Sequence, residues 1–324
     1  MPALSHIKEP VKKELEIFED YFRKAMRTKV PLLSIITNYI YRRKGKQLRP
    51  LLVFLTSGMT GGIKESTYVA AGMIELLHTA TLIHDDVVDE AYERRSSFSI
   101  NALWRSKVAV LVGDFLLSKG LLLAIETNEF ELLRNMSEAV KEMSEGELMQ
   151  IERSRKMDID EMTYFDIIQK KTATLISSCT VNGATSSGAS AEDIEKAREI
   201  GLNLGMAFQL RDDIFDYQSK GILGKPTGND IKEKKLTLPL IYALGKANSS
   251  TQRQVIRLVK KSRHDAKSLN EVINFVHAAN GIEYAEAKMF DYRDKAKEII
   301  KMFPRSSYSQ SLIQLAEFIT NRNQ

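Results

Sequence analysis

The sequence has few of the features that mark secreted, disulfide-bonded or membrane-spanning proteins. Cys179 is the only cysteine among 324 residues, which excludes a disulfide within the chain and is typical of a reducing compartment. Residues 2–13 are polar and charged, unlike a secretory signal. The richest apolar stretch, residues 108–117, is interrupted by Asp114 and falls short of the ~20 residues of a membrane span. These absences predict a soluble, cytoplasmic protein without a transmembrane segment.

Charge is balanced enough to argue against nucleic acid as a partner. The net charge is +5, and the basic residues gather only in short clusters, at residues 42–46, 232–235 and 260–263. A nucleic-acid binder usually presents a broader basic face. We interpret the cluster at 260–263 as the solvated end of a helix.

Proline is scarce as well. Most of the seven prolines lie where helices would begin or stop, and no segment alternates between apolar and polar residues like a strand. We therefore predict an all-α fold, a large single-domain bundle of antiparallel helices around a deep central cavity, covering residues 1–324. The expected helices cover residues 9–28, 31–42, 48–60, 65–90, 100–126, 128–153, 158–186, 191–219, 236–247, 250–263, 267–278, 281–302 and 306–321.

Two nearly identical acidic clusters end apolar helical stretches 127 positions apart. They are Asp85-Asp86-Val87-Val88-Asp89 and Asp212-Asp213-Ile214-Phe215-Asp216. In each cluster the first and last aspartates are four residues apart and share one helix face, where like charges repel. Mg²⁺ prefers oxygen ligands and commonly takes a few carboxylates together with substrate phosphate oxygens. The clusters therefore predict a Mg²⁺-dependent enzyme that acts on a diphosphate.

Basic residues that suit diphosphate oxygens accompany these clusters. Arginine grips phosphate through a planar fork, and lysine acts as a mobile point charge. The candidates are Lys46, Arg49, His78, Arg94, Arg95, Lys171, Lys225 and Lys235. Two polar loops, residues 94–100 and 220–236, each follow one cluster and are expected to close over the site.

An ordered set of motifs between about residues 40 and 240 resembles the trans-isoprenyl diphosphate synthases, the all-α prenyltransferase family. The matching segments are Gly45-Lys46-Gln47-Leu48-Arg49-Pro50, Glu75-Leu76-Leu77-His78, the two aspartate clusters, Arg94-Arg95, Gly113-Asp114, Glu145-Gly146-Glu147 with Gln150, Lys171-Thr172-Ala173, Gly205 to Arg211, Gly228-Asn229-Asp230 and Lys235 to Pro239. The resemblance implies the isoprenoid synthase fold, a homodimer, and Mg²⁺-dependent head-to-tail condensation of an allylic prenyl diphosphate with isopentenyl diphosphate.

The resemblance also implies roles for individual residues. Mg²⁺ would be coordinated by Asp85, Asp89 and Asp212, with Asp86, Asp213 and Asp216 as further ligands or their neighbours. The allylic diphosphate would be contacted by Arg94, Lys171, Lys225 and Lys235, supported by Thr172, Gln209 and Asp230. Isopentenyl diphosphate would be bound by Lys46, Arg49, His78 and Arg95. The residues expected to carry the catalysis are Asp85, Asp89, Asp212, Lys171 and Lys235.

The chain departs from the family pattern at three places. Ser96 to Ser99 follow the arginine pair where the family commonly has Gly and Pro. Gln47 stands at a position that is often basic. Lys234 stands where the family often has Gly, which leaves open whether Lys234 or Lys235 contacts the diphosphate.

Residues before the first cluster are expected to set the product length. In the family, a bulky aromatic four or five residues upstream stops growth early, whereas Thr81 and Ala80 are small. One helical turn advances about 5.4 Å, close to one isoprene unit. The next residues that could form the floor of the pocket for the prenyl tail, and so limit its length, are therefore Leu77 and then Ile74 or Met73. Residues 121–125 are a further candidate floor. We predict a medium- to long-chain enzyme whose product exceeds C20, in the range C30 to C50.

Two other functions are compatible with parts of this pattern. A class I terpene cyclase shares the bundle and one aspartate cluster, but it normally has a different second metal motif and lacks the cations for isopentenyl diphosphate. A non-catalytic subunit of a heteromeric synthase is the other alternative, although such a subunit could lose its metal carboxylates and this chain has kept both sets.

Overall fold

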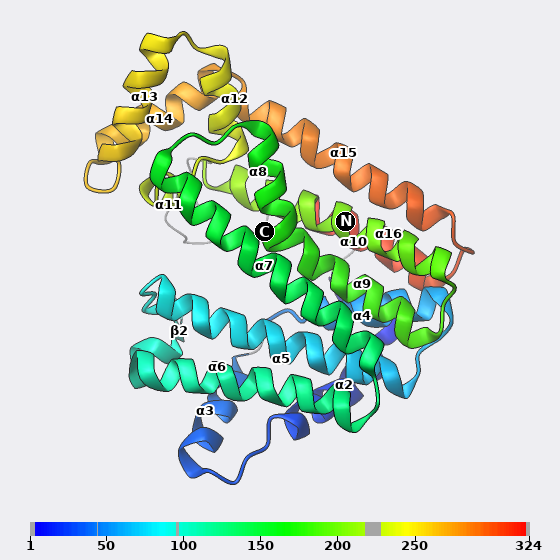
Figure 1. Cartoon of the computed structure of the whole chain (residues 1–324). Helices are drawn as coiled ribbons and strands as arrows, with labels where there is room; N and C mark the ends of the chain where they lie inside the picture. The colour runs from blue at the N-terminus through cyan, green and yellow to red at the C-terminus, as the bar shows by residue number, and fades with distance from the viewer. Residues whose placement is uncertain (1–3, 44, 95–96, 218–227, 322–324) are drawn as a thin grey trace.

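The computed structural model describes residues 4–43, 45–94, 97–217 and 228–321, and helices dominate these segments (Figure 1). The helices are α1 Leu4–Lys8, a 3₁₀ turn Glu9–Val11, α2 Lys12–Ala25, α3 Pro31–Arg42, α4 Leu48–Thr60, α5 Glu65–Val88, α6 Ile100–Glu126, α7 Phe130–Lys156, α8 Glu161–Ile168, a π-helical turn Gln169–Ala173, α9 Thr174–Ser187, α10 Ala191–Phe215, α11 Asn229–Lys232, α12 Leu238–Lys246, α13 Ser249–Lys261, α14 Ala266–Ala278, α15 Gly281–Lys301 and α16 Ser307–Thr320. The all-α prediction is confirmed.

Two details differ from the sequence prediction. The expected helix 158–186 is divided into α8 and α9 by the π-helical turn Gln169–Ala173. A short antiparallel hairpin also follows α5, with β1 Glu93–Arg94 paired to β2 Ser97–Phe98. Strands of two residues are too short to leave an alternating pattern in the sequence.

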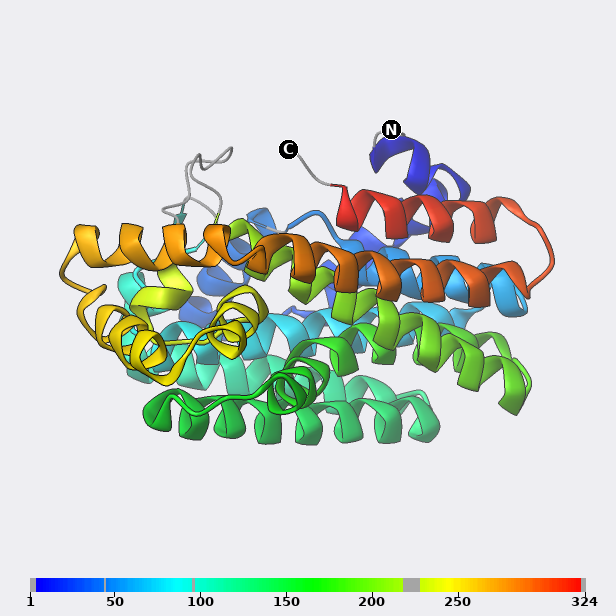
Figure 2. The same ribbon diagram turned by 90° about the horizontal axis from the view of Figure 1, so that it is seen from above.

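The long helices form layers. Figure 2 shows α15 along one side of the molecule and α7 along the opposite side, with α9 and α10 between them. Helices α5 and α6 lie side by side in the lower part of Figure 1. Helix α10 joins two apolar cores, because Ile200 and Leu204 belong to one and Met206, Leu210 and Ile214 to the other.

The two helices that carry the aspartate clusters are held by apolar faces. On α5, the predicted stripe of Val69, Met73, Leu76, Leu77 and Ala80 is buried. Burial of such a stripe fixes the rotation of a helix, since the opposite face must then point outward. On α10, Leu204, Met206, Ala207, Leu210 and Ile214 are buried in the same way. Each helix ends at the last aspartate of its cluster, Asp89 or Asp216.

Helix α6 is apolar on the outside as well. Within the described segments it is the one helix with the length and composition that a membrane span would need, with a mean hydropathy of 2.1 over its best window and 33% of that window buried. One face of α6 packs along α5. The other presents Leu103, Leu111, Leu122 and Ile125 to the surface.

Candidate active site

The first aspartate cluster divides its side chains between two directions. Asp85 and Asp89 are exposed at the end of α5, and the Asp89 amide donates to the Asp85 carbonyl at 2.8 Å. Asp86 is only 3% exposed and lines a cavity on the other side of the helix, together with His78. Two carboxylates of this cluster, rather than three, therefore face outward.

The second cluster is divided in the same manner. Asp212 is exposed, while Asp213 is only 4% exposed. The Asp216 carboxylate accepts hydrogen bonds from the amides of Asn229 at 2.9 Å and Asp230 at 3.0 Å, which open α11. Asp216 thus joins the end of α10 to the segment that leads to Lys235.

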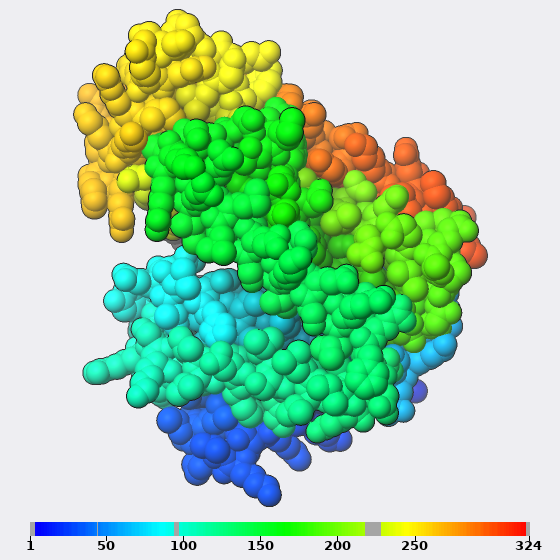
Figure 3. Space-filling view, viewed as in Figure 1, coloured from blue at the N-terminus to red at the C-terminus, as the bar shows by residue number. Residues whose placement is uncertain are grey.

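Lys235 lies within electrostatic reach of both clusters. Burial alone would lower the pKa of its ammonium, but a 2.6 Å hydrogen bond to Glu233, together with the charges of Asp230 and Asp89, raises that pKa. Asp89 belongs to the first cluster and Asp230 contacts the second, so the clusters share one mouth. Figure 3 shows the surface hollowed at this end, between α5–α6 and the part formed by α7 and α11–α14.

Lys234 does not line the cavity that Lys235 and Asp213 line. Its side chain is exposed and its φ is 61°, in the left-handed region that favours glycine. A left-handed backbone explains why glycine suits this position in the family pattern. Lys235, by contrast, lines the cavity beside Asp213.

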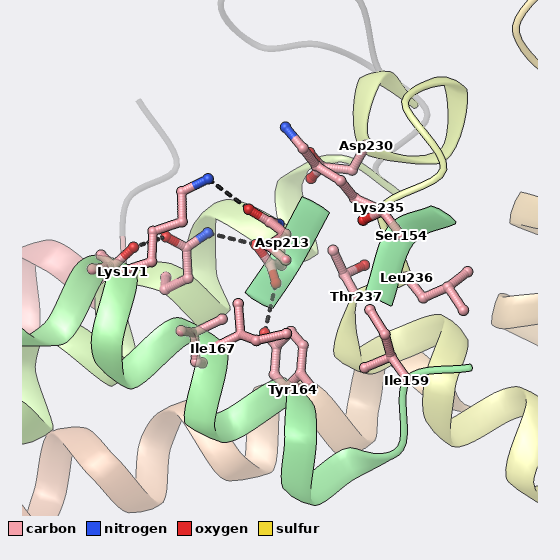
Figure 4. Close-up of a pocket in the computed structure, with 14 residues that line it drawn as sticks. Ser154, Ile159, Tyr164, Ile167, Lys171, Asp213, Asp230, Lys235, Leu236 and Thr237 are labelled. Atoms are coloured by element: carbon pink, nitrogen blue, oxygen red, sulfur yellow. Dashed lines mark hydrogen bonds between the residues drawn. The ribbon is translucent and has the colours of Figure 1, made fainter. Parts of the chain in front are cut away.

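The π-helical turn projects Lys171 and Thr172 toward the same cavity (Figure 4). The extra residue in such a turn redirects the side chains that follow it, and π-turns often occur at functional sites. Gly205 on α10 makes room for this turn, since a Cβ there would lie 2.4 Å from the Ala173 Cα. The ammonium of Lys171 is 2.6 Å from the Gln150 side-chain oxygen and 2.5 Å from a Glu147 carboxylate oxygen.

Behind the cavity runs a chain of hydrogen bonds that ends on Asp213. Thr172 donates to Gln209 at 2.7 Å, and Gln209 donates to Asp213 at 2.7 Å. The buried Tyr164 hydroxyl donates to the other Asp213 oxygen at 2.6 Å. Burial, and then the charge of Asp230, raises the pKa of Asp213 to about 8. Burial and the charge of Asp216 likewise raise the pKa of Asp230 to about 6. Additional positive charge at this mouth would favour the ionised carboxylates.

The cavity between these groups has a volume of about 90 Å³ (Figure 4). Its polar wall combines cations, amides, hydroxyls and carboxylates, and its remaining wall is apolar. The lining residues are Gln150, Ser154, Ile159, Tyr164, Ile167, Ile168, Lys171, Thr172, Gln209, Asp213, Asp230, Lys235, Leu236 and Thr237. Such a wall can hold an anionic group by ammonium and hydroxyl donors.

A second cavity, of about 310 Å³, lies beside the first cluster and reaches the hairpin. Its wall includes His78, which is 8% exposed, with Gly45, Glu75, Asp86 and Phe98. Three of the four residues expected to bind isopentenyl diphosphate can be located. His78 lines this cavity, Lys46 is exposed beside Gly45, and Arg49 is half-buried in the first turn of α4.

Three other predicted cations are less completely described. The backbone of Arg94 forms β1, next to the second cavity. Arg95 and Lys225 lie outside the described residues.

A third cavity, of about 210 Å³, is apolar and lies between α5, α6 and α7. From α5 it is lined by Met73 and Leu77, two of the residues named in the chain-length prediction, and α6 contributes Leu121. Ile74, Ala80 and Thr81, which the prediction also named, do not line this cavity. The prediction missed the contribution of α7, which is Leu133, Met136, Ser137 and Val140.

The donors suit a divalent cation held jointly with a substrate. Within the described residues no three carboxylate, imidazole or thiol side chains converge tightly enough to hold a metal ion by themselves. Asp85, Asp89 and Asp212 nevertheless present hard oxygen donors on exposed helix ends that share one mouth. Magnesium commonly takes only one or two carboxylates and completes its shell with water and phosphate oxygens. The residues present therefore fit such an ion.

Sequence reasoning missed Tyr164. This tyrosine lies 49 positions before Asp213, and nothing around it in the sequence marks a site. Its role follows only from the packing of α8 against the π-helical turn. Gln150 and Thr237 were part of the recognised motifs without an assigned role, and both line the first cavity.

Comparisons with known proteins agree with this geometry. The sequence profile of the family described as "Polyprenyl synthetase" matches residues 30–276. The chain is 33% identical to the all-trans-nonaprenyl-diphosphate synthase (geranyl-diphosphate specific) of Rhodobacter capsulatus over 97% of both chains. It is 34% identical to heptaprenyl diphosphate synthase component 2 of Bacillus subtilis, over 95% of this chain and 88% of that one.

A solved structure matches almost the whole fold. The polyprenyl synthase from Caulobacter crescentus, complexed with calcium and isoprenyl diphosphate, superimposes with a TM-score of 0.91 at 30% identity, over 99% of this chain and 98% of that one. The chain thus belongs to the polyprenyl synthetase family and is a trans-prenyltransferase that forms polyprenyl diphosphates.

Proposed function

We propose that this enzyme extends an allylic prenyl diphosphate with isopentenyl diphosphate units to a product longer than C20, in the range C30 to C50. The main support is a set of three cavities: a polar one lined by Lys171, Asp213 and Lys235, and two that α5 helps to line, one beside His78 and an apolar one at Met73 and Leu77. These suit, in turn, a diphosphate, a second diphosphate and a growing prenyl tail. The relatives are named for C35 and C45 products, which supports the proposed length.

The proposed mechanism assigns the charged residues to the departing diphosphate. Lys171 and Lys235, with Arg94 and Lys225, place positive charge against its oxygens while the allylic C–O bond breaks. Asp85, Asp89 and Asp212 would hold Mg²⁺, which when bound supplies further positive charge to the leaving group. The hydrogen bond from Thr172 to Gln209 ties the π-helical turn to α10, and the one from Tyr164 to Asp213 ties α8 to α10.

The second substrate would be oriented by the residues around His78. Lys46, Arg49, His78 and Arg95 would bind the diphosphate of isopentenyl diphosphate, so that its alkene faces the allylic carbon. The alkene forms the new C–C bond, and a proton then leaves the adjacent carbon for an oxygen of the released diphosphate. Breaking the allylic C–O bond leaves an allylic carbocation, which water would quench. The apolar walls of the third cavity, which we call the tail cavity, would keep water from it.

We propose further that the chain is one domain and acts as a soluble, cytoplasmic homodimer. Helix α10 contributes to both apolar cores, which supports a single domain. Leu103, Leu111, Leu122 and Ile125 form an exposed apolar face on α6 that a second copy would cover. Closed twofold symmetry is the common arrangement for soluble oligomers.

The test uses the purified chain alone with Mg²⁺, radiolabelled isopentenyl diphosphate, and dimethylallyl, geranyl or farnesyl diphosphate as starter. Incorporation of label into products longer than C20 is expected. A terpene cyclase would convert the allylic substrate without incorporating label. A non-catalytic subunit, an alternative suggested by the "component 2" name of one relative, would be inactive until a partner chain is added.

A further inference from the structure

The outer face of α13 is basic along its length. Arg253, Arg257, Lys260 and Lys261 are exposed, and their spacing of four, seven and eight residues places them on one helix face. Val255 and Val259 on the opposite face are buried in the core. Arg263 and Lys267 continue the basic surface into the first turn of α14. We call residues 253–267 the basic hairpin.

The basic hairpin carries the charge imbalance of the whole protein. It contains six lysines and arginines and one carboxylate, Asp265, a net charge of +5 that equals the net charge of the chain. In the described part of the protein, none of the six cations forms an ion pair. A helix whose outward charge were only for solubility would normally mix both signs. The concentrated positive charge therefore points to an anionic partner.

The basic hairpin is attached directly to the active-site mouth. The Ser262 hydroxyl, between the two helices, donates to the Ile231 carbonyl of α11 at 3.2 Å. Asp230, the neighbouring residue, lines the first cavity together with Lys235. In Figures 1 and 3, α13 and α14 lie at the same end of the molecule as the β-hairpin, with the mouth between them.

Large apolar side chains are exposed on the other side of the mouth. Val88 at the end of α5 is 68% exposed, Tyr92 is 70% exposed and Phe98 on β2 is 60% exposed. Aromatic side chains favour the headgroup region of a bilayer, where the ring is partly desolvated. One end of the protein thus combines a cationic surface, apolar side chains and the opening of the site.

We propose that this end docks on an anionic lipid bilayer through the basic hairpin, which places the active-site mouth at the membrane surface. Clusters of four to eight lysines and arginines on an amphipathic helix are the size that binds anionic leaflets. Because Val255 and Val259 are buried in the protein, the attraction is electrostatic and peripheral rather than insertive. A bilayer suits this enzyme better than a nucleic acid or an acidic protein, since its polyprenyl diphosphate product has a charged head and an apolar tail that partitions into lipid.

The test is co-sedimentation of the purified enzyme, without substrate, with vesicles of phosphatidylcholine that contain or lack about 30% phosphatidylglycerol. The variant is Arg257→Glu/Lys260→Glu/Lys261→Glu. The matched control is Lys12→Glu/Lys13→Glu/Lys24→Glu, which reverses three exposed charges on α2. Circular dichroism and turnover in detergent without vesicles, both expected to be unchanged, establish that each variant is folded and active.

The wild-type protein and the α2 control are expected to sediment with the anionic vesicles and not with neutral ones. The affinity of the α13 variant for anionic vesicles should be at least roughly tenfold lower, and about 500 mM NaCl should release the wild type from them. If the α13 variant bound the anionic vesicles as well as the wild type, the proposal would be overturned. It would also be overturned if the wild-type protein did not bind anionic vesicles. Retention on RNA or DNA without vesicle binding would also overturn it, in favour of a nucleic-acid surface. Because no substrate is present, the result does not depend on which product the enzyme makes.

Discussion

The imidazole of His84 occupies the space in which a side chain on Gly113 would stand. A Cβ built on Gly113 would lie 2.2 Å from His84 Nε2. The same nitrogen is 3.2 Å from the Val110 carbonyl and 3.5 Å from the Asp114 carboxylate. Helix α6 thus holds His84, and His84 directly precedes Asp85. The Gly113-Asp114 motif therefore has a physical role: it fixes the end of α5 from which two of the predicted metal ligands project.

Gly113→Ala is therefore expected to lower both stability and activity. Alanine is the better helix former by about 1 kcal/mol, but the clash with His84 should outweigh this and cost about 1–3 kcal/mol overall. Displacing His84 should also move Asp85 and lower kcat/KM by roughly tenfold or more. Thermal unfolding and steady-state kinetics measure the two effects.

The control for this substitution is Gly120→Ala, two turns along the same helix. A Cβ there would meet nothing closer than 3.7 Å. This variant should be at least as stable as the wild type, since it gains helix propensity without a clash. If Gly113→Ala behaved like Gly120→Ala, the steric account of the motif would be wrong.

Product length should depend on how far down α5 a bulky residue is placed. Ala80 is five residues before Asp85 and Met73 is twelve, a difference of about 10 Å, or about two isoprene units. Ala80→Phe is expected to give the shortest product, Met73→Phe an intermediate one and the wild type the longest. Chromatography of the dephosphorylated products distinguishes these lengths.

Ile17→Phe provides the matched control, because Ile17 is 48% exposed on α2 and does not line the tail cavity. Its product should have the wild-type length. Identical products from Ala80→Phe and Met73→Phe would contradict a pocket that runs along α5.

The sequence determines the helices and the exposed acids well, because both leave periodic signals. The spacing of four residues predicted that Asp85 and Asp89 share a helix face, and in the structure both are exposed at the end of α5. The same periodicity could not predict the break at Gln169–Ala173, because a π-helical turn inserts a residue without changing composition. The sequence also could not predict that Asp86 and Asp213 are buried, because neighbouring aspartates of one cluster face different surroundings.

Contacts between distant segments were the least predictable part. Tyr164 reaches Asp213 because α8 packs against the π-helical turn, which packs against α10, and α7 completes the tail cavity. Single-residue patterns carry no information on such pairings. The family resemblance marked some residues that make such contacts. It singled out Gly113, for example, whose contact with His84, 29 positions away, only the structure shows.

Substitutions of Asp212 and Asp216, the two outer aspartates of the second cluster, should affect stability and activity differently. Asp216→Ala removes the acceptor of two amides at the start of α11, so it should cost about 1 kcal/mol of stability as well as activity. Asp212→Asn removes a charge from an exposed position of an acidic cluster, so stability should be kept while kcat falls by about a hundredfold or more. Denaturant titration and product assays separate the two. Loss of stability in Asp212→Asn would argue for a structural role instead.

The Cys179 thiol should be unreactive in the folded protein. It should also make the free energy of unfolding depend on pH in a defined range. Burial raises the pKa of its thiol from 9.0 to about 12. Below pH 9 the thiol is neutral in both states. Between pH 9 and about 12 only the unfolded chain loses the proton, so stability should fall by up to about 1.4 kcal/mol per pH unit. A thiol reagent should modify Cys179 only after denaturation.

Cys179→Ala isolates this contribution from the buried tyrosines, which also retain their protons at high pH. The free energy of unfolding of this variant should decline less steeply above pH 9 than that of the wild type. Equal slopes, or rapid modification of the native thiol, would show that this site is open to solvent.

The exposed apolar face of α6 should control the oligomeric state. Leu111 is 60% exposed and Leu122 is 48% exposed, and their spacing of eleven residues keeps them on the same side of the helix. Leu111→Glu/Leu122→Glu would place two like charges on each side of the proposed twofold interface, where they would repel those of the second copy. We expect a monomer by light scattering at concentrations where the wild type is a dimer.

Met302→Glu is the control, since Met302 is 67% exposed at the far end of α15 and should not affect assembly. The α6 variant should also lose activity, because α6 forms one wall of the tail cavity and would face water when uncovered. A variant that remained dimeric would show that the copies meet elsewhere. A wild-type protein already monomeric at micromolar concentration would leave the apolar face of α6 to another kind of partner, such as the second chain of a heteromeric synthase.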